Sequence, residues 1–192
     1  MKRGKSMKSF IALTFATSLL ADPNGVYVEI GAGQGFGSIE TKGSKIYLDA
    51  GYVGSLAIGY QANIYRIELE ENYKKDSVYS FDNVSASGDY VRESKMINIY
   101  LSAYNDSNLV SSIGGGVGIS DISLKNLQEL ERVVPDLVNN GVLTFDGSLS
   151  IGYMVTTSIT ATVKYTYFYT QKSDNFDSNG NSTFTFGLRY VF

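Results

Sequence analysis

The stretch from Thr183 to Phe192 reads TFTFGLRYVF, and side chains of two kinds alternate along it. Successive side chains of an extended strand point to opposite faces. One face of this stretch carries only bulky apolar residues: Phe184, Phe186, Leu188, Tyr190 and Phe192. The other face carries mainly small or polar residues: Thr183, Thr185, Gly187, Arg189 and Val191. This pattern predicts a strand with lipid on one side and a polar lumen on the other.

The same period-2 alternation recurs along most of the chain before this stretch. Seven further segments fit the pattern or its glycine-rich and serine-rich variants: 26–36, 56–62, 65–73, 96–104, 110–119, 143–155 and 159–170. Together with the last stretch they make eight strands, and an even number suits an up-and-down barrel. We therefore predict an all-β fold, an eight-stranded antiparallel up-and-down transmembrane β-barrel.

The connections between these segments alternate in length. Short turns fall near Asn63, at 105–108 and at 156–158, whereas long connections span 38–53, 74–93, 120–142 and 171–181. Short periplasmic turns and long external loops are typical of membrane barrels. The order therefore supports the barrel and predicts that the four long segments are external loops.

The third long loop contains the one helical pattern of the sequence. The pattern has Ser123 as a possible N-cap and Pro135 as the residue that would end or kink the helix. The residues near 3.6 spacing are Leu124, Leu127, Leu130 or Glu131, Val134 and Leu137. We predict a short helix over the mouth of the barrel. A partner-binding element and the absence of a stable helix are the two alternatives.

The N-terminal residues have the organisation of a secretory signal. Basic side chains at positions 2, 3, 5 and 8 precede an apolar run from Phe10 to Leu20, and Ala21 follows as a small residue. The run has about half of the roughly 20 residues that a spanning helix needs. We predict a cleaved signal peptide at 1–21 and a barrel domain at 22–192, with Met7 as an alternative start.

The composition narrows the possible chemistry. The chain has no Cys and no His, which excludes disulfides, thiolate metal sites, cysteine nucleophiles and the commonest general base. Its formal net charge is −3 and it has no long basic run, so nothing indicates nucleic-acid binding. We expect no catalytic residues, no cofactor and no metal, and therefore no enzyme.

Glycine clusters at 31–37 and 114–118 invite comparison with phosphate-binding loops. Phe36 and Ile119 stand where the last glycine of a GxGxxG frame would be, and no GK[ST] ending follows. Inward glycines in a narrow barrel instead make room for bulky neighbours.

Six charged residues, three acids and three bases, occupy strand positions that should face the lumen. They are Glu29, Arg66, Glu68, Glu70, Lys164 and Arg189. Ionised groups in a tight interior are costly unless they are paired. We therefore predict a salt-bridged plug in the lumen, with Glu29 and Arg189 at similar height if the first and last strands close the ring.

Aromatic residues occupy outward-facing positions toward the ends of the strands. We predict an aromatic belt at the headgroup level that includes Tyr60, Tyr153, Tyr167, Tyr169 and Phe184.

The last residues of the chain also resemble a known sequence signal. Thr185, Gly187, Tyr190 and Phe192 match the specified positions of the C-terminal assembly signal of outer-membrane barrels. Internal phrases such as Ile58-Gly59-Tyr60 resemble the opacity-type surface antigens, and the OmpA and OmpX barrels are further relatives in architecture. The resemblance implies a barrel in the bacterial outer membrane, inserted by the barrel-assembly machinery, with variable external loops.

The function expected from these features is that of a non-enzymatic scaffold. Its partners would be the outer-membrane lipid bilayer and a host or surface ligand at the loops. The alternatives are a narrow porin-like channel for small solutes, a soluble lipocalin-like carrier and a lipid-modifying outer-membrane enzyme.

Overall fold

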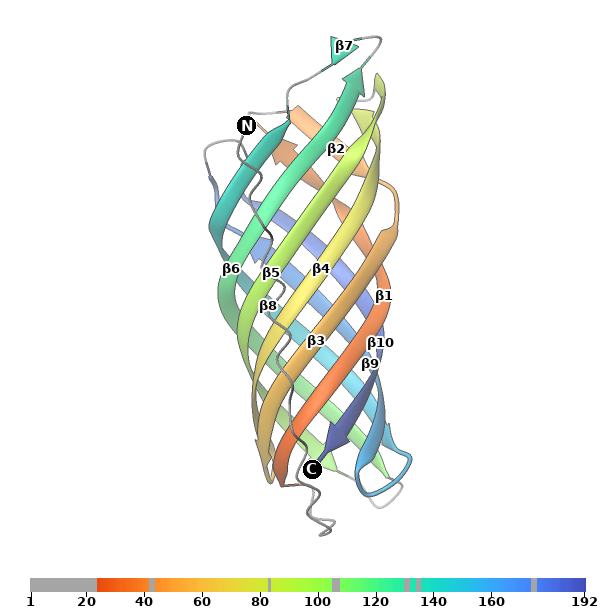
Figure 1. Ribbon diagram of the computed structural model, residues 1–192, viewed down its shortest axis with the longest axis vertical. Helices are drawn as coiled ribbons and strands as arrows, with labels where there is room; N and C mark the ends of the chain where they lie inside the picture. The colour runs from red at the N-terminus through yellow and green to blue at the C-terminus, as the bar shows by residue number, and fades with distance from the viewer. Residues whose placement is uncertain are drawn as a thin grey trace, which may run out of the picture.

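The chain forms one antiparallel sheet that is closed into a tilted barrel (Figure 1). This computed structural model describes residues 24–41, 44–82, 84–104, 108–129, 132–133, 136–173 and 176–192. The signal-peptide prediction for 1–21 lies outside the described residues, so the division into signal peptide and barrel domain stays a prediction.

Ten strands make up the sheet. They are β1 (Gly25–Thr41), β2 (Ser44–Leu48), β3 (Gly51–Ala62), β4 (Tyr65–Phe81), β5 (Val84–Tyr104), β6 (Leu109–Glu129), β7 (Arg132–Val133), β8 (Leu137–Met154), β9 (Ile159–Thr170) and β10 (Asn179–Val191). Eight of them form the ring, in the order β1, β3, β4, β5, β6, β8, β9 and β10. Strand β2 lies between β1 and β4 above the end of β3, and β7 pairs only with β6. The predicted eight-stranded antiparallel barrel is confirmed.

Strands β1 and β10 close the ring. Their register runs from Tyr27 opposite Val191 to Gly37 opposite Asn181. At the lower end of the seam the backbone N–H of Phe192 donates to the carbonyl of Val26 over 2.9 Å. Both ends of the barrel chain therefore meet at the end that carries the short turns, where the C-terminus is marked in Figure 1.

The burial of side chains is the reverse of that in a soluble protein. On β4, Ile67 and Leu69 are 51% and 57% exposed, whereas Arg66 and Glu68 are only 2% exposed. The alternation is set by the strand geometry, which sends successive side chains outward and inward. The apolar residues face outward, and the polar residues fill the interior.

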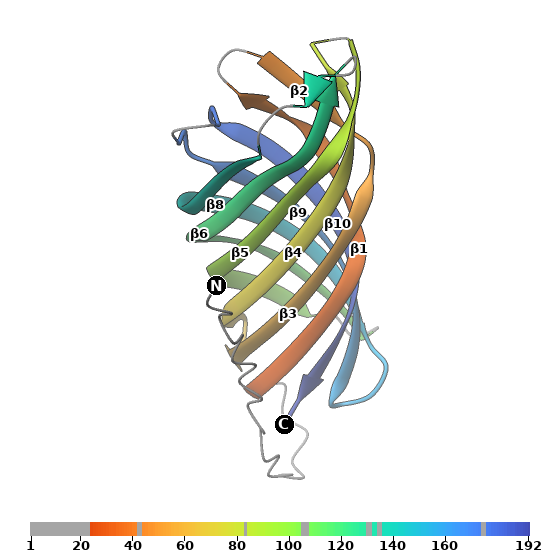
Figure 2. The same ribbon diagram turned by 45° about the horizontal axis from the view of Figure 1, so that its top comes forward.

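The predicted external loops are mostly strand. Strands β4 and β5 run through 74–93 almost to their turn, and β6, β7 and β8 cover most of 120–142. The longer strands rise beyond the rest of the barrel at the upper end, beside β2 and β7 (Figures 1 and 2). The prediction of long loops there is wrong, because strand pairing continues above the level where apolar and polar residues alternate in the sequence.

The predicted helix is also wrong where its residues are described. Ser123, Leu124 and Leu127 belong to β6, and Leu137 belongs to β8. Leu124 and Leu127 both face inward because the β5–β6 register shifts beside Asn126, whose φ is 53°. A β-bulge therefore produced the three-residue spacing that resembled a helix. Residues 130–131 and 134–135 lie outside the described residues, and the described part of the chain contains no helix that could cross a membrane.

The upper end of the barrel has its own apolar core. Ten buried residues form it: Ile39, Ile46, Leu48, Val78, Tyr90, Ile122, Leu124, Leu127, Val142 and Phe176. We call this group the apolar cluster. It lies inside the strand extensions and above the charged interior, so the inside of the barrel changes from polar to apolar along its length.

Candidate functional site

The predicted pair Glu29 and Arg189 lies on the seam between β1 and β10. The two residues are opposite each other in the register. Arg189 donates from Nε and Nη2 to Oε2 of Glu29 over 2.8 and 2.6 Å, and both side chains are buried. This ion pair links the first ring strand to the last.

A second group surrounds Glu68 on β4. The hydroxyl of Tyr27 donates to Glu68 Oε2 over 2.6 Å, and Nε of Arg66 lies 3.8 Å from the same oxygen. The guanidinium of Arg66 also stacks 4.1 Å from the centre of the Tyr100 ring, a favourable cation–π arrangement. Glu68 is therefore held from three sides by β1, β4 and β5.

The third group joins β9 to β4 across the lumen. Lys164 Nζ lies 2.7 Å from Glu70 Oε2 and 3.9 Å from Glu68 Oε1. The side-chain amide of Asn98 donates to both carboxylates, over 3.3 and 3.4 Å. All six charged residues singled out from the sequence thus lie in the interior and pair there. We call these six residues the lower charge layer.

A further polar group above this layer was missed from the sequence. Lys74 Nζ lies 2.7 Å from Asp76 Oδ2, and Arg92 donates to Asn181 over 2.5 Å and to Asn72 over 3.2 Å. We call these five residues the upper charge layer. Positions 72, 74 and 76 continue the inward parity of 66, 68 and 70, but Lys75 and Ser77 are polar as well, so the sequence does not separate the two faces there.

The two carboxylates at the centre of the interior are engaged by neighbouring side chains. Glu68 and Glu70 are buried carboxylates held by Lys164, Asn98, Arg66 and Tyr27, so neither faces an open pocket. Within the described ranges, no group of three or more acidic side chains is arranged to hold a metal ion. Eight strands leave a lumen that side chains just fill.

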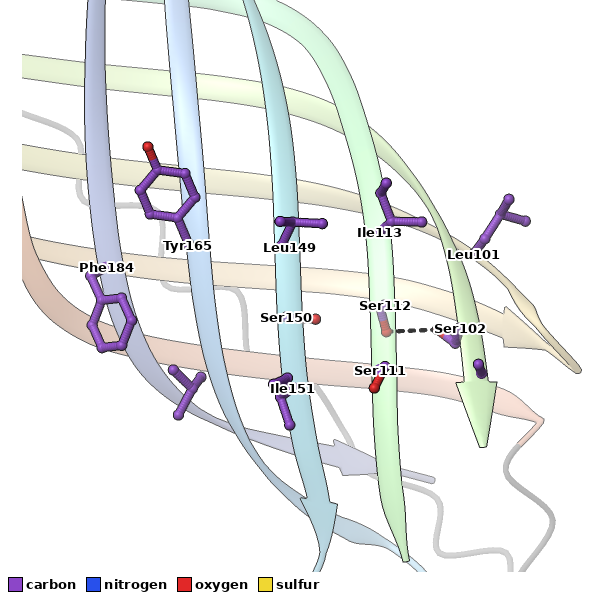
Figure 3. Close-up of a pocket in the computed structure, with 12 residues that line it drawn as sticks. Leu101, Ser102, Ser111, Ser112, Ile113, Leu149, Ser150, Ile151, Tyr165 and Phe184 are labelled. Atoms are coloured by element: carbon purple, nitrogen blue, oxygen red, sulfur yellow. Dashed lines mark hydrogen bonds between the residues drawn. The ribbon is translucent and has the colours of Figure 1, made fainter. Parts of the chain in front are cut away.

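The exterior carries an apolar belt. Figure 3 shows Leu101, Ile113, Leu149, Tyr165 and Phe184 along one line over β5, β6, β8, β9 and β10, which agrees with the register. Serines at neighbouring positions point the other way, and Ser102 and Ser112 are 2.9 Å apart there. Such an exterior suits the hydrocarbon of a lipid bilayer.

The predicted belt aromatics all lie on this outer face and are exposed. Tyr60 and Tyr153 lie near the short turns, whereas Tyr167, Tyr169 and Phe184 lie higher on β9 and β10. A stacked pair that the sequence prediction missed, Tyr52 and Tyr73, has ring centres 6.0 Å apart on β3 and β4. Aromatic rings therefore lie toward both ends of the apolar belt.

The four residues that match the C-terminal assembly signal lie on both faces of β10. Thr185 is buried in the interior, and Gly187 lies beside Thr162 and Glu29. Tyr190 and Phe192 form an edge-to-face ring pair with centres 5.0 Å apart. Their role in assembly stays a proposal.

The upper rim carries an aromatic pair with a cation, in which Tyr79 is exposed and Tyr47 is half-buried. Tyr47 and Tyr79 have ring centres 6.0 Å apart, and Lys45 Nζ lies 5.1 Å from the centre of the Tyr47 ring. The backbone N–H of Lys45 donates to Asp82 Oδ1 over 2.7 Å and so holds the pKa of this carboxyl below its usual value. We call Lys45, Tyr47 and Tyr79 the rim cluster.

Comparison with known proteins finds likeness in structure. No protein-family model matches the sequence, and no curated protein sequence does either. Neisserial surface protein A is 17% identical, with a TM-score of 0.67 over 88% of this chain and 97% of that chain. The attachment invasion locus protein Ail of Yersinia pestis, in complex with the heparin analogue sucrose octasulfate, is 14% identical, with a TM-score of 0.52 over 87% of this chain and 99% of Ail. The outer membrane protease OmpT of Escherichia coli is 11% identical, with a TM-score of 0.53 over 88% of this chain and 97% of OmpT.

The fold is that of the bacterial outer-membrane β-barrels. The three similar proteins bear names as different as surface protein, attachment protein and protease. This fold therefore hosts several activities, and the function has to be argued from the residues of this chain.

Proposed function

We propose that the protein resides in the bacterial outer membrane as a closed, non-enzymatic scaffold that presents its upper rim for attachment to a host or surface ligand. The observation that carries the proposal is the double closure of the interior. The lower charge layer fills the barrel at the level of the belt, and the apolar cluster fills it above. The strand extensions that enclose the apolar cluster rise above the belt and carry the rim cluster on their outer face.

The outward belt supports the membrane location. Large apolar residues such as Ile99, Ile151 and Phe186 are each about 60% exposed, at 59%, 61% and 62%. Exposing them to water would leave an apolar patch far larger than soluble monomers carry. A soluble lipocalin-like carrier is disfavoured for the same reason, because its apolar side chains would have to line the interior.

The paired interior argues against the two remaining alternatives. A porin-like channel needs an open polar path, whereas Lys164 and Glu70 form a short ion pair across the lumen and Glu29 is paired with Arg189 on the neighbouring strand. A lipid-modifying enzyme needs a reactive group near the outer rim with an orienting partner. Tyr47, Tyr79 and Lys45 form an aromatic surface with one cation. Within these three described residues, no reactive group is paired with an orienting partner.

One experiment with two readouts tests the proposal. The purified protein is reconstituted into liposomes that contain a small polar solute. We measure solute release, and we measure vesicle capture on surfaces coated with matrix proteins or glycosaminoglycans. We expect release no faster than from protein-free liposomes, together with capture on at least one coating.

The double variant Tyr47→Ala and Tyr79→Ala identifies the attaching surface. It should lower capture, because aromatic side chains contribute much of the energy at protein interfaces. Tyr65→Ala, which removes an exposed tyrosine at the opposite end of the barrel, is the matched control and should leave capture unchanged. Rapid release of the solute would favour the channel, and capture that the rim variant does not lower would contradict the role of the rim.

A further inference from the structure

Two charged residues interrupt the apolar belt. The register of β1, β3, β4, β5, β6 and β8 aligns one outward row across the sheet: Ile30, Leu56, Glu71, Lys95, Ile119 and Leu143. The four flanking members of this row are bulky, apolar and exposed. Glu71 and Lys95 are also exposed, and they are direct cross-strand neighbours on β4 and β5.

Apolar residues continue on both sides of this pair and below it. Leu56 and Ile119 flank it along the row, and Leu69 and Ile97 form the next outward pair toward the short turns. A charged side chain on the lipid face of a barrel is destabilising in proportion to its depth. Glu71 and Lys95 therefore need a polar partner at the depth of the belt.

Neither residue has such a partner in the single barrel. Among the described residues, ion pairs of 4.0 Å or less join seven pairs of groups, and neither Glu71 nor Lys95 belongs to any of them. The outer surface around them is hollowed. A groove of about 730 Å³ is lined by Leu56, Leu69, Glu71, Lys95, Ile97 and Ile119 among other residues.

We propose that a second copy of this chain packs on the β4–β5 face, so that Glu71 of each copy pairs with Lys95 of the other. The two residues lie on adjacent strands at similar heights, on either side of the line between these strands. A two-fold axis along the membrane normal through this line would bring each residue opposite the cross-strand neighbour of its counterpart. This operation generates an isologous interface, in which two equivalent ion pairs form at once.

The strands are tilted, so the line between β4 and β5 crosses such an axis at one level, and the level of Glu71 and Lys95 is the one placed on it. Around this level the flanking residues Leu56, Leu69, Ile97 and Ile119 are apolar and exposed, which suits contact with the same surface of a second copy.

Equal and opposite charges at one level favour a second copy over a lipid headgroup. A lipid phosphate would engage Lys95 and leave the carboxylate of Glu71 without a partner. A second copy pairs both groups at once. The inference rests on the membrane location proposed above, because only a lipid surrounding makes the lone charges costly.

The test uses charge reversal in two separate variants. Glu71→Lys makes the face wholly positive at this row, and Lys95→Glu makes it wholly negative. Each variant alone should dimerise roughly a hundredfold more weakly than the wild type, because the substitution turns both equivalent ion pairs into pairs of like charge. An equimolar mixture of the two should recover dimers, because each copy then supplies the charge that the other lacks.

The mixed dimer can be detected by giving the two variants different affinity tags and recovering one copy through the other from lipid bilayers. Lys125→Glu, an exposed charge reversal on β6 outside this ladder, is the control and should leave the wild-type dimer unchanged.

Three results would overturn the proposal. They are a monomeric wild type at high protein-to-lipid ratio, a mixture that dimerises no better than its components, and an equal loss in Lys125→Glu. The second result would assign Glu71 and Lys95 to a pair within one copy or to a headgroup.

Heat-dependent mobility in SDS shows separately whether each variant is folded, so a failure of the membrane location is distinguishable from a failure of the dimer. If a charge reversal prevents folding, Glu71→Gln and Lys95→Gln replace it. Each of these must weaken the dimer, and an unchanged dimer overturns the proposal.

Discussion

Buried charges in this barrel hold together strands that are far apart in the sequence. Glu29 and Arg189 are separated by 160 positions, yet their two hydrogen bonds are among the shortest in the interior. An ion pair in such a place stabilises little compared with an apolar pair of the same size, whereas loss of one partner leaves a buried charge. The effect of a substitution therefore depends on whether one or both members are replaced.

Arg189→Met should lower the free energy of unfolding by about 3 to 5 kcal/mol, because Glu29 would stay buried and charged. The double variant Glu29→Met and Arg189→Met should regain most of this loss. Urea unfolding in detergent micelles, followed by circular dichroism, measures both.

Lys172→Met is the control for this substitution, since Lys172 pairs with Asp177 in an exposed position. It should leave the unfolding curve in place. If Arg189→Met behaves like Lys172→Met, or if the double variant is less stable than the single one, the pairing explanation fails.

The lower charge layer could be predicted from parity alone. Arg66, Glu68 and Glu70 alternate with Ile67 and Leu69, so the sequence itself separates inside from outside. The upper charge layer could not be reached in the same way, because Lys74 and Asp76 alternate with Lys75 and Ser77, which are polar as well. Above the belt the outer face meets water, and the contrast that identifies a strand disappears.

Individual strands run from the apolar belt into the strand extensions above it, and their outward residues change in polarity on the way. On β4 and β5 the outward residues are apolar up to Leu69 and Ile97 and charged or polar beyond Glu71 and Lys95. The same strand therefore passes through two surroundings, and the cost of a given substitution should change along it.

Replacement of Ile99 or Val163 by Arg should impair insertion and cost roughly 2 to 4 kcal/mol, since both lie on the outer face within the belt. The yield of the heat-modifiable folded form in liposomes measures this effect. Ser77→Arg, outward on β4 above the belt, is the matched control and should insert normally. Normal insertion of both belt variants would show that the assignment of the two faces is wrong.

The number of strands could be predicted, whereas local irregularities within them could not. Eight ring strands follow from the alternation, but the bulge at Asn126 placed Leu124 and Leu127 on one face with helical spacing. Only the pairing of β6 with β5, which is a long-range contact, distinguishes that bulge from a helical turn.

The molecule as a whole is divided into two parts with different cores. The part within the belt is closed by charge pairs, and the part above it is held by the apolar cluster, as in a water-soluble domain. The two parts share the long strands β4, β5, β6 and β8. Because different interactions hold them, they should respond separately to a loss of packing.

Phe176→Ala should loosen the upper part by about 3 to 5 kcal/mol, because Phe176 is 2% exposed within the apolar cluster. Hydrogen exchange should accelerate in the strand extensions and stay slow in the belt. Phe186→Ala, the same change at an outward position that is 62% exposed, is the comparison and should leave exchange of the extensions unchanged. Equal acceleration in both parts would show that the barrel opens as one unit.

The seam between β1 and β10 has a consequence for biogenesis. The strand that completes the ring is the last of the ten to be synthesised, so until it arrives β1 presents a bare edge of unpaired backbone groups. A chain interrupted before β10 would keep two such edges and would leave Glu29 without Arg189. Closure of the seam therefore depends on the last strand: without β10, the edges of β1 and β9 would carry backbone groups that lipid cannot satisfy.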